Sequence, residues 1–326
     1  MEQLQYIIDL WEDADPGVRA AVDDYFERGG QQAVAQLSAM YAREVVPRQK
    51  EKMGGMLSHY AKRLAIRGLG EIAGRCSSGG ECSLLEAGFL VCLLAEPSLR
   101  REDYMARVMP PIMAALEEIS DDKTALENVT LLNHVFYKRY GYSVSNPFDM
   151  SLDNSLLMRV AKNRHGNPFA LSLLYFIVAQ GAGLPIYPLC FTGGFVPVYE
   201  ENGKILFNIN VFHQGEIFVE NNISNMVKHQ AAALGVNVDI GEAVVKKDCS
   251  ILVMYLEFLQ MLYSNASDTV AQMDIDDAIE ALGIDMEAYP EVDLEGFDFA
   301  STFADLVITD GTTVNTAAET VLYRSS

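Results

Sequence analysis

The sequence is poor in cysteine, tryptophan and positive charge. Its 326 residues include 5 cysteines and 1 tryptophan, and 24 Lys and Arg residues stand against 45 Asp and Glu residues. So few cysteines, in an odd number, build no disulfide framework, and we expect reduced thiols. The net charge of −21 repels a phosphate backbone, which argues against nucleic acid as a partner.

The sequence also lacks a basic leader and a long unbroken apolar run. Acidic residues occur within the first fifteen positions, so a secretory signal is not expected. The most apolar stretch, residues 169–199, is interrupted repeatedly by glycine and proline. A membrane-spanning helix needs about 20 uninterrupted apolar residues. We therefore expect a cytoplasmic protein without a membrane segment.

Motifs for phosphate binding, dinucleotide binding, metalloprotease or serine-hydrolase chemistry are absent, since the sequence contains no GxxxxGK[ST], GxGxxG, HExxH or GxSxG. Cys76 and Cys82 lie close enough to form a redox clip or half of a zinc site, but their spacing is not CxxC and no second pair follows. We read them as ordinary thiols, and we expect neither a metal nor a cofactor.

Residues 1–80 are predicted to be a helical, HEAT-like preamble. After a first short helix, Asp15 and Pro16 are typical of a second helix start, which Gly29 and Gly30 should end. A third amphipathic run follows, without a fixed repeat period. Glycine and serine are frequent in residues 68–80, which predicts a loop there.

Residues 81–265 begin with helices. Ser83 and Glu86 have the capping-box spacing. A helical pattern over residues 101–119 contains Pro110 and Pro111, so we expect a break or kink there. Two more helices are predicted at residues 124–140 and 152–164.

The pattern changes at Pro168, where a nearly all-apolar helix over residues 169–180 precedes three apolar runs typical of strands. The second and third runs are joined through Asn202 and Gly203, a strong hairpin signal. The expected strands are residues 186–191, 195–199 and 205–209. Further helices are predicted at residues 223–233, 250–263 and 275–282.

Residues 266–326 are predicted to hold that last short helix and an acidic, flexible tail. From Asp274 onward acidic residues recur, and Arg324 is the only basic residue among them. Such a composition is typical of a solvated extension, although acidic segments also dock on basic partners.

Two segments carry a family resemblance: VAKNRHGNPFALSLLYFIVAQGAGLPIYPLCFTGGFVPVY and, after it, FNINVFHQGEIF. They resemble the bacterial transglutaminase-like core of SirB-type proteins. LLEAGFLVCLLAEPSLRREDYMARV and DCSILVMYLEFLQMLY look like its flanking helices, so the resemblance spans about residues 80–265. It implies an α+β fold with a papain/transglutaminase-like core. In that core a buried helix packs on a small antiparallel sheet, with helical N-terminal and C-terminal flanks.

The resemblance also identifies three positions. A transglutaminase-type mechanism needs a cysteine at the start of the buried helix, a histidine on a nearby strand and a carboxylate or amide that orients it. The family turns place Ala170 at the nucleophile, Gly194 at the histidine and Asn210 at the orienting group. A methyl group cannot attack an acyl carbon. The resemblance therefore implies a pseudoenzyme that binds a protein or peptide.

An alternative is a displaced site in a cysteine-dependent amidase or acyl transferase, built from Cys190, His213 and Asn210. A small buried cysteine and a histidine in a polar turn are the simpler interpretation. Ser172 should turn away from a groove, because it lies about 200° around the helix from Ala170. The candidate residues for lining a peptide groove are His165, Asn167, Tyr175, Phe195 and Tyr199.

Overall fold

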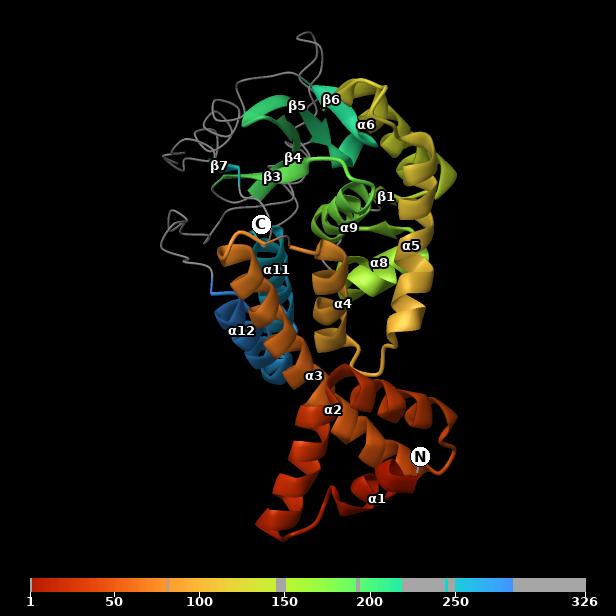
Figure 1. The fold of residues 1–326 in the computed structure, drawn as a ribbon, viewed down its shortest axis with the longest axis vertical. Helices are drawn as coiled ribbons and strands as arrows, with labels where there is room; N and C mark the ends of the chain where they lie inside the picture. The colour runs from red at the N-terminus through yellow and green to blue at the C-terminus, as the bar shows by residue number, and fades with distance from the viewer. Residues whose placement is uncertain are drawn as a thin grey trace, which may run out of the picture. The chain divides into compact units, whose positions relative to one another are not determined.

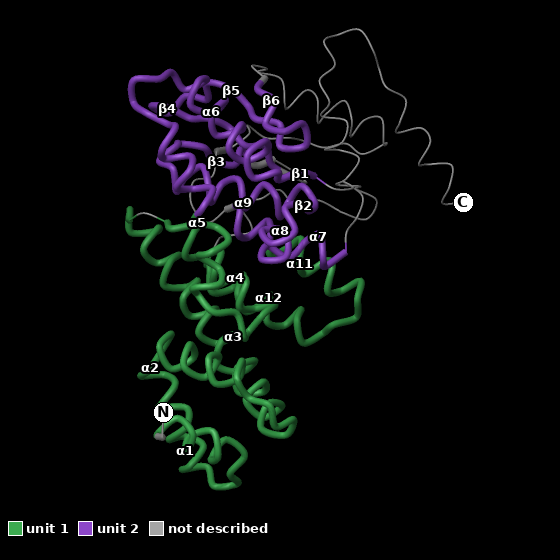
Figure 2. Tube along the Cα trace, turned by 90° about the vertical axis from the view of Figure 1, so that its right-hand side faces the viewer, with its two compact units in different colours: residues 1–109, 256–283 green, residues 110–255, 284–326 purple. Residues whose placement is uncertain are grey.

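The computed structural model describes residues 2–80, 82–144, 151–191, 194–218, 244–245 and 250–283. The chain divides into two compact units, one made of residues 1–109 and 256–283 and the other of residues 110–255 and 284–326 (Figure 2). These units differ from the three segments expected from the sequence. The reason is that helices on both sides of residues 110–255 pack together in the first unit.

The first unit, unit 1, is helical (Figure 1). Two further helices are divided between the units: α5 spans Arg101–Glu118 and α11 spans Ser250–Asn265. The helices that lie wholly in unit 1 are α1 (Glu2–Leu10), α2 (Pro16–Arg43), α3 (Pro47–Ser77), α4 (Leu84–Ala95) and α12 (Thr269–Leu282).

Helix α2 begins as predicted, with the Asp15 side chain accepting a hydrogen bond from the Gly17 amide at 2.7 Å and Pro16 in the first turn. Gly30 has φ 49° and ψ −137°, so α2 consists of two helical parts that meet at this residue. The predicted end of the second helix is therefore confirmed in its geometry. Phe26, Leu37 and Met56 belong to the apolar cluster that α1, α2 and α3 share.

The loop predicted at residues 68–80 is wrong, because α3 continues to Ser77. Its glycines serve close packing of helices. A Cβ on Gly68 would lie 2.8 Å from Cδ1 of Leu90 in α4, and one on Gly70 would lie 3.3 Å from the carbonyl oxygen of Ala281 in α12. Leu69, between them, is fully buried.

Two other helix expectations have different outcomes. The Ser83 hydroxyl accepts a hydrogen bond from the Glu86 amide at 3.2 Å, which confirms the predicted cap of α4. The break expected in α5 is absent, since the helix runs through Pro110 and Pro111. Burial of side chains along α5, including Val108, offsets the loss of backbone hydrogen bonds at the prolines.

The second unit, unit 2, combines helices with a small sheet. The order of its five-stranded sheet is β6-β5-β4-β3-β7, with every pairing antiparallel, while β1 and β2 pair in parallel. The elements are α6 (Ala125–Asn133), the π-helix η1 (His134–Arg139), β1 (Ser143–Val144), α7 (Leu152–Ser155), α8 (Leu157–Asn163), β2 (His165–Gly166), α9 (Pro168–Gly181), β3 (Ile186–Phe191), β4 (Gly194–Glu201), β5 (Lys204–Asn210), the 3-10 helix η2 (Val211–His213), β6 (Glu216–Phe218) and β7 (Val244–Val245).

The helices before α9 are more divided than predicted. The segment 124–140 changes from α6 to the π-helix η1 at His134. The segment 152–164 is interrupted at Leu156. There the Tyr255 hydroxyl accepts a hydrogen bond from the Leu157 amide at 2.9 Å and donates one to the Ser155 carbonyl at 2.7 Å. A tyrosine distant in sequence thus supplies the partners that a continuous helix would have used.

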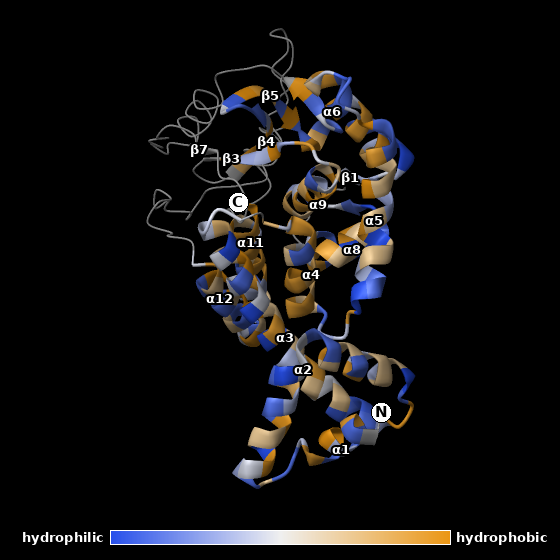
Figure 3. Ribbon diagram, in the orientation of Figure 1, coloured by the Kyte–Doolittle hydropathy of each residue, from blue (hydrophilic) through white to orange (hydrophobic). Residues whose placement is uncertain are grey.

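The centre of unit 2 agrees with the predicted fold class. Helix α9 is buried along its length, and Figure 3 shows its apolar character together with that of α4. The three predicted strands are β3, β4 and β5, and Asn202 and Gly203 have φ values of 54° and 76° in the hairpin between β4 and β5. The fold is α+β, with a small antiparallel sheet beside a buried helix and helical flanks.

The predicted helices near residues 250–263 and 275–282 are α11 and α12. The predicted helix at residues 223–233 and the acidic tail from residue 284 lie outside the described residues. In the described part of the chain, no helix has both the length and the apolarity that a membrane crossing requires.

Candidate functional site

The start of α9 is fixed by Asn167, whose side chain is fully buried. Its Oδ1 accepts a hydrogen bond from the Ala170 amide at 3.0 Å, and its Nδ2 donates to Oγ of Ser155 at 2.7 Å. The backbone amide of Asn167 donates to the Asn154 carbonyl at 2.7 Å. Asn167, predicted as a groove residue, is therefore a helix cap with its polar groups occupied.

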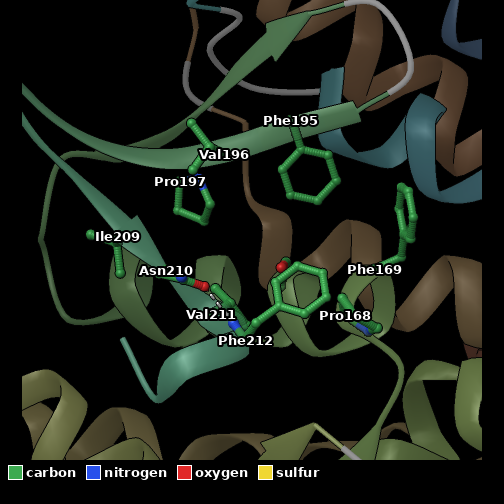
Figure 4. A pocket seen from close by; sticks show the side chains of 10 residues that line it. Pro168, Phe169, Phe195, Val196, Pro197, Ile209, Asn210, Val211 and Phe212 are labelled. Atoms are coloured by element: carbon green, nitrogen blue, oxygen red, sulfur yellow. Dashed lines mark hydrogen bonds between the residues drawn. The ribbon is translucent and has the colours of Figure 1, made fainter. Parts of the chain in front are cut away.

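A pocket lies between this helix start, strands β4 and β5, and η2 (Figure 4). Its volume is about 20 Å³, close to the space of one water molecule. The described lining residues contain no Cys, His, Asp, Glu, Lys or Arg. They are Pro168, Phe169, Ser172, Phe195, Val196, Pro197, Ile209, Asn210, Val211 and Phe212.

Aromatic rings form much of the pocket lining. The ring centroids of Phe169 and Phe195 lie 5.7 Å apart in an edge-to-face arrangement, and Phe195 lies 6.0 Å from Phe176. Figure 4 shows the Phe212 ring beside Pro168, on the side of the pocket opposite Phe195. The pocket is thus a small apolar space with two polar side chains in its lining, Ser172 and Asn210.

Asn210 stabilises the turn that closes the pocket. Its Oδ1 accepts a hydrogen bond from the Phe212 amide at 3.1 Å, so this side chain caps η2. Asn210, at the position that the resemblance assigns to an orienting group, therefore forms a hydrogen bond with the backbone of the next turn. Only 6% of Asn210 is exposed, which limits its access to a ligand.

The helix face toward the pocket carries Phe169 and Ser172, three residues apart. Ser172 was expected to turn away from any groove, yet it lines this pocket. Ala170 is fully buried and does not belong to the described lining. Of the predicted positions, the structure thus brings Phe195 and Asn210 together in the pocket, with the unpredicted Ser172.

Three other predicted groove residues lie elsewhere. His165 is exposed, with Nδ1 2.9 Å from the Asn163 carbonyl oxygen. Tyr175 is fully buried, and burial raises the pKa of its hydroxyl. The Tyr199 ring stacks on Phe207 with centroids 5.2 Å apart, and burial likewise raises the Tyr199 pKa. Within the described lining, none of the three reaches the pocket.

The alternative site residues stand on separated segments. Cys190 on β3 is paired with Phe195 on β4, and β4 separates β3 from β5. Neighbouring strands lie about 4.8 Å apart, so the Cys190 backbone is two strand spacings from β5. His213 follows β5 in η2, and it is exposed.

Sequence reasoning missed Asn133, which joins three parts of unit 2. Its Nδ2 donates to the Gly215 carbonyl at 2.6 Å, and its Oδ1 accepts from the Tyr175 hydroxyl at 2.8 Å. Gly215 has φ 78°, and a Cβ there would lie 2.1 Å from Oδ1 of Asn133. The turn after η2 is therefore held against α6 and α9. No local motif could have revealed a bond between residues 82 positions apart.

Metal ligands are not gathered in this region: across the described ranges, no three His, Cys, Asp or Glu side chains are placed to hold a metal ion. The structure gives the pocket an apolar lining and, among the described lining residues, no group that takes up or releases a proton near neutral pH.

A protein-family model described as the transglutaminase-like superfamily matches residues 103–247. This range contains α9, the sheet and all the described lining residues of the pocket. Comparison with curated proteins and with solved structures gives no match.

Proposed function

We propose that the transglutaminase-like superfamily domain at residues 103–247 is non-catalytic and binds a protein or peptide. The observation that carries this proposal is the composition of the pocket at the start of α9. Acyl transfer through a covalent intermediate needs a nucleophile and a base within hydrogen-bonding reach. None of the described lining residues is a base.

Ser172 is the hydroxyl in this lining, and a serine hydroxyl is a weak nucleophile without an adjacent base. Asn210, the other polar side chain, is an amide and cannot take up the proton at neutral pH. Ala170, at the nucleophile position of the resemblance, is a buried methyl group. These features support a domain that retains the framework of the superfamily without its proton transfer.

Binding is proposed at the edge of the sheet beside the pocket. Within the described residues, β6 pairs on one side, with β5, where Ile217 lies opposite Ile209. An extended peptide adds to such an edge through main-chain hydrogen bonds. The peptide would run past η2, whose Phe212 is partly exposed, so an apolar side chain at that point would be preferred.

The SirB-type assignment and a bacterial, cytoplasmic setting belong to the same proposal. The SirB-type assignment is supported by the Gly166-Asn167-Pro168 turn at the start of α9 and by the Asn210-Val211-Phe212 turn after β5. In proteins of the SirB type, we expect such turns at the start of the buried helix and at the end of a strand.

The catalytic arm of the test measures hydrolysis and amine transfer with chromogenic amides and esters. Thiol labelling with an amide-mimicking electrophile is measured in parallel. We expect no turnover above that of a Ser172→Ala variant, and no site-selective labelling. Labelling of Cys190 together with an amidase activity that Cys190→Ala abolishes would overturn the proposal in favour of a cysteine enzyme.

The binding arm uses a peptide selected from a random display library on the purified protein. Methylating alternate backbone amides of that peptide should weaken binding about tenfold or more, since each pairing hydrogen bond contributes about 1 kcal/mol. Phe212→Ala should also weaken it, whereas the matched control Ile205→Ala, on the exposed start of β5, should not. Unchanged affinity of the methylated peptide would exclude edge pairing.

A further inference from the structure

Unit 1 contains a second cavity, a cleft of about 690 Å³ formed by α2, α3 and α12. This volume lies in the range of about 300 to 1,000 Å³ typical of ligand sites. The cleft residues lie outside the range matched by the family model. The lining includes the apolar side chains of Phe26, Tyr60 and Leu64, which we call the floor. Phe26 and Tyr60 are each 4% exposed, and their rings stack at 4.0 Å.

The positive charges of the cleft are already balanced. Glu27 on α2 accepts a hydrogen bond from Arg63 at 2.9 Å and one from Arg67 at 2.6 Å. Nη1 of Arg63 also lies 4.0 Å from Oδ1 of Asp23, and that carboxylate accepts a hydrogen bond from the Tyr60 hydroxyl at 2.8 Å. The two arginines thus join α2 to α3, and they do not leave an open anion site.

The opposite wall carries charge of one sign. Asp277 and Glu280 lie three residues apart on α12, so they share one helix face, and both line the cleft. Neither side chain makes a hydrogen bond or ion pair with the residues that the structure describes. The charge that remains uncompensated in the cleft is therefore negative, and it stands beside an apolar floor.

We propose that this cleft is the docking site for a basic amphipathic helix of a partner protein. Apolar side chains of that helix would cover the floor, and its Lys or Arg side chains would pair with Asp277 and Glu280. Helix-in-groove recognition uses such an apolar face with flanking charges. The net charge of −21 favours a cationic partner and disfavours a second copy of this chain.

The acidic wall can be altered without removing the anchors of α12. Lys62 on α3 pairs with Asp274 at 2.5 Å, and Ile275, Ala278 and Leu282 are buried. Asp277 and Glu280 contribute to neither set of contacts. A double variant, Asp277→Asn with Glu280→Gln, therefore tests recognition more directly than stability.

The only tryptophan provides the signal for the experiment. Trp11 lies 5.3 Å from the Tyr60 ring, which forms part of the cleft floor. A designed tryptophan-free peptide of about 16 residues, with leucines on one face and lysines beside them, is long enough to be helical. It is titrated into the full chain while Trp11 fluorescence is followed, at about 50 mM salt, where charges are weakly screened.

The acidic-wall variant should bind this peptide about tenfold more weakly than the unmodified chain. The matched control is Asp121→Asn with Asp122→Asn, which removes the same charge from an exposed turn in the other unit. It should bind as the unmodified chain does. Circular dichroism and thermal unfolding of both variants establish that α12 remains folded.

Three results would overturn the proposal. The first is no fluorescence change on addition of the basic peptide. The second is an equal loss of affinity in both double variants, which would assign binding to the general negative field of the chain. The third is tighter binding of a peptide with the acidic sequence of residues 284–300, which would assign the cleft to Arg63 and Arg67.

Discussion

The pocket beside α9 has a volume of about 20 Å³ and no acid or base among its described lining residues, whereas the cleft on α3 has a volume of about 690 Å³ and is lined by two arginines and three carboxylates. The superfamily match covers the first and not the second. In this chain, the residues matched to the transglutaminase-like superfamily surround a small apolar pocket. The charged side chains that line the cleft lie in the other unit.

The contrast reflects how each cavity is built. The pocket is bordered by a helix start capped by Asn167, two paired strands and a tight turn capped by Asn210. The cleft is bordered by three helices whose mutual contacts are ion pairs and an apolar floor. The capped segments leave only a small space between apolar side chains, while the three helices leave a larger one. Four predictions test this difference.

The largest effect is expected from Gly215→Ala, in the turn that follows η2 beside the pocket. Its φ of 78° and the 2.1 Å approach of a Cβ to Oδ1 of Asn133 leave no space for a methyl group. We expect a loss of about 3 kcal/mol in the free energy of unfolding, measured by urea denaturation. Gly203→Ala is the control, because Gly203 has φ 76° but open space around it. It should cost about 1 kcal/mol. Equal losses would contradict the packing argument.

The second prediction concerns the ion pair that joins α3 to α12, two of the helices that border the cleft. Lys62→Met leaves Asp274 without the ammonium group that it pairs with at 2.5 Å, at a site where the two side chains are only 16% and 22% exposed. We expect a destabilisation of about 2 kcal/mol. Arg28→Met, which breaks the exposed pair with Asp24, should change stability by about 0.3 kcal/mol. Similar values for both variants would show that α12 is held by apolar contacts alone.

The third prediction is a pH dependence near the cleft. Partial burial and, next, the nearby Arg63 charge lower the pKa of His59 from its ordinary value of 6.5. The unfolded chain then binds this proton more readily than the folded chain, so His59 destabilises the fold as the pH falls through about 6.5. His59→Gln should lose less stability than the unmodified chain between about pH 7 and pH 5. Parallel stability curves would refute the assignment.

The smallest effect is expected from Ala170→Cys, which restores a thiol at the position of the family nucleophile. Ala170 is fully buried, so the new thiol should react with a small methanethiosulfonate reagent no faster than the native cysteines do. Ser172→Cys places a thiol in the pocket lining, and this thiol should react faster than the thiol of Ala170→Cys. Rapid labelling of the Ala170→Cys variant, together with new amidase activity, would show that the pocket opens in solution.

The sequence predicted the centre of unit 2 well, because its signals are local. Asn167 and Pro168 determine where α9 starts, and Asn202 with Gly203 forms the hairpin as expected. The strongly apolar residues between these points predicted a buried helix followed by buried strands. The same local signals failed at Gly68 and Gly70. There glycine permits close helix packing, which a sequence cannot distinguish from a loop.

The candidate sites were harder to predict for a different physical reason. Ser172 lines the pocket because α9 turns its Phe169 face toward β4, and that rotation depends on contacts with residues far along the chain. The cleft lies among α2, α3 and α12, and the Lys62–Asp274 pair between α3 and α12 links residues 212 positions apart. The spacing of Asp277 and Glu280 was visible in the sequence. Their place beside an apolar floor was not.

The π-helix η1 has a consequence for how the chain tolerates change in length. The Tyr140 amide donates to the Val135 carbonyl at 2.9 Å, so this turn contains one residue more than an α-helical turn would. It also buries three consecutive side chains, Val135, Phe136 and Tyr137. An α-helix turns about 100° per residue, so the same three side chains would cover a wider arc in an α-helix than they do in the π-helix. Removing one residue between His134 and Arg139 would convert this turn into an ordinary α-helical turn and rotate part of this aromatic cluster outward. The additional residue of the π-helical turn is therefore needed for the packing of the core.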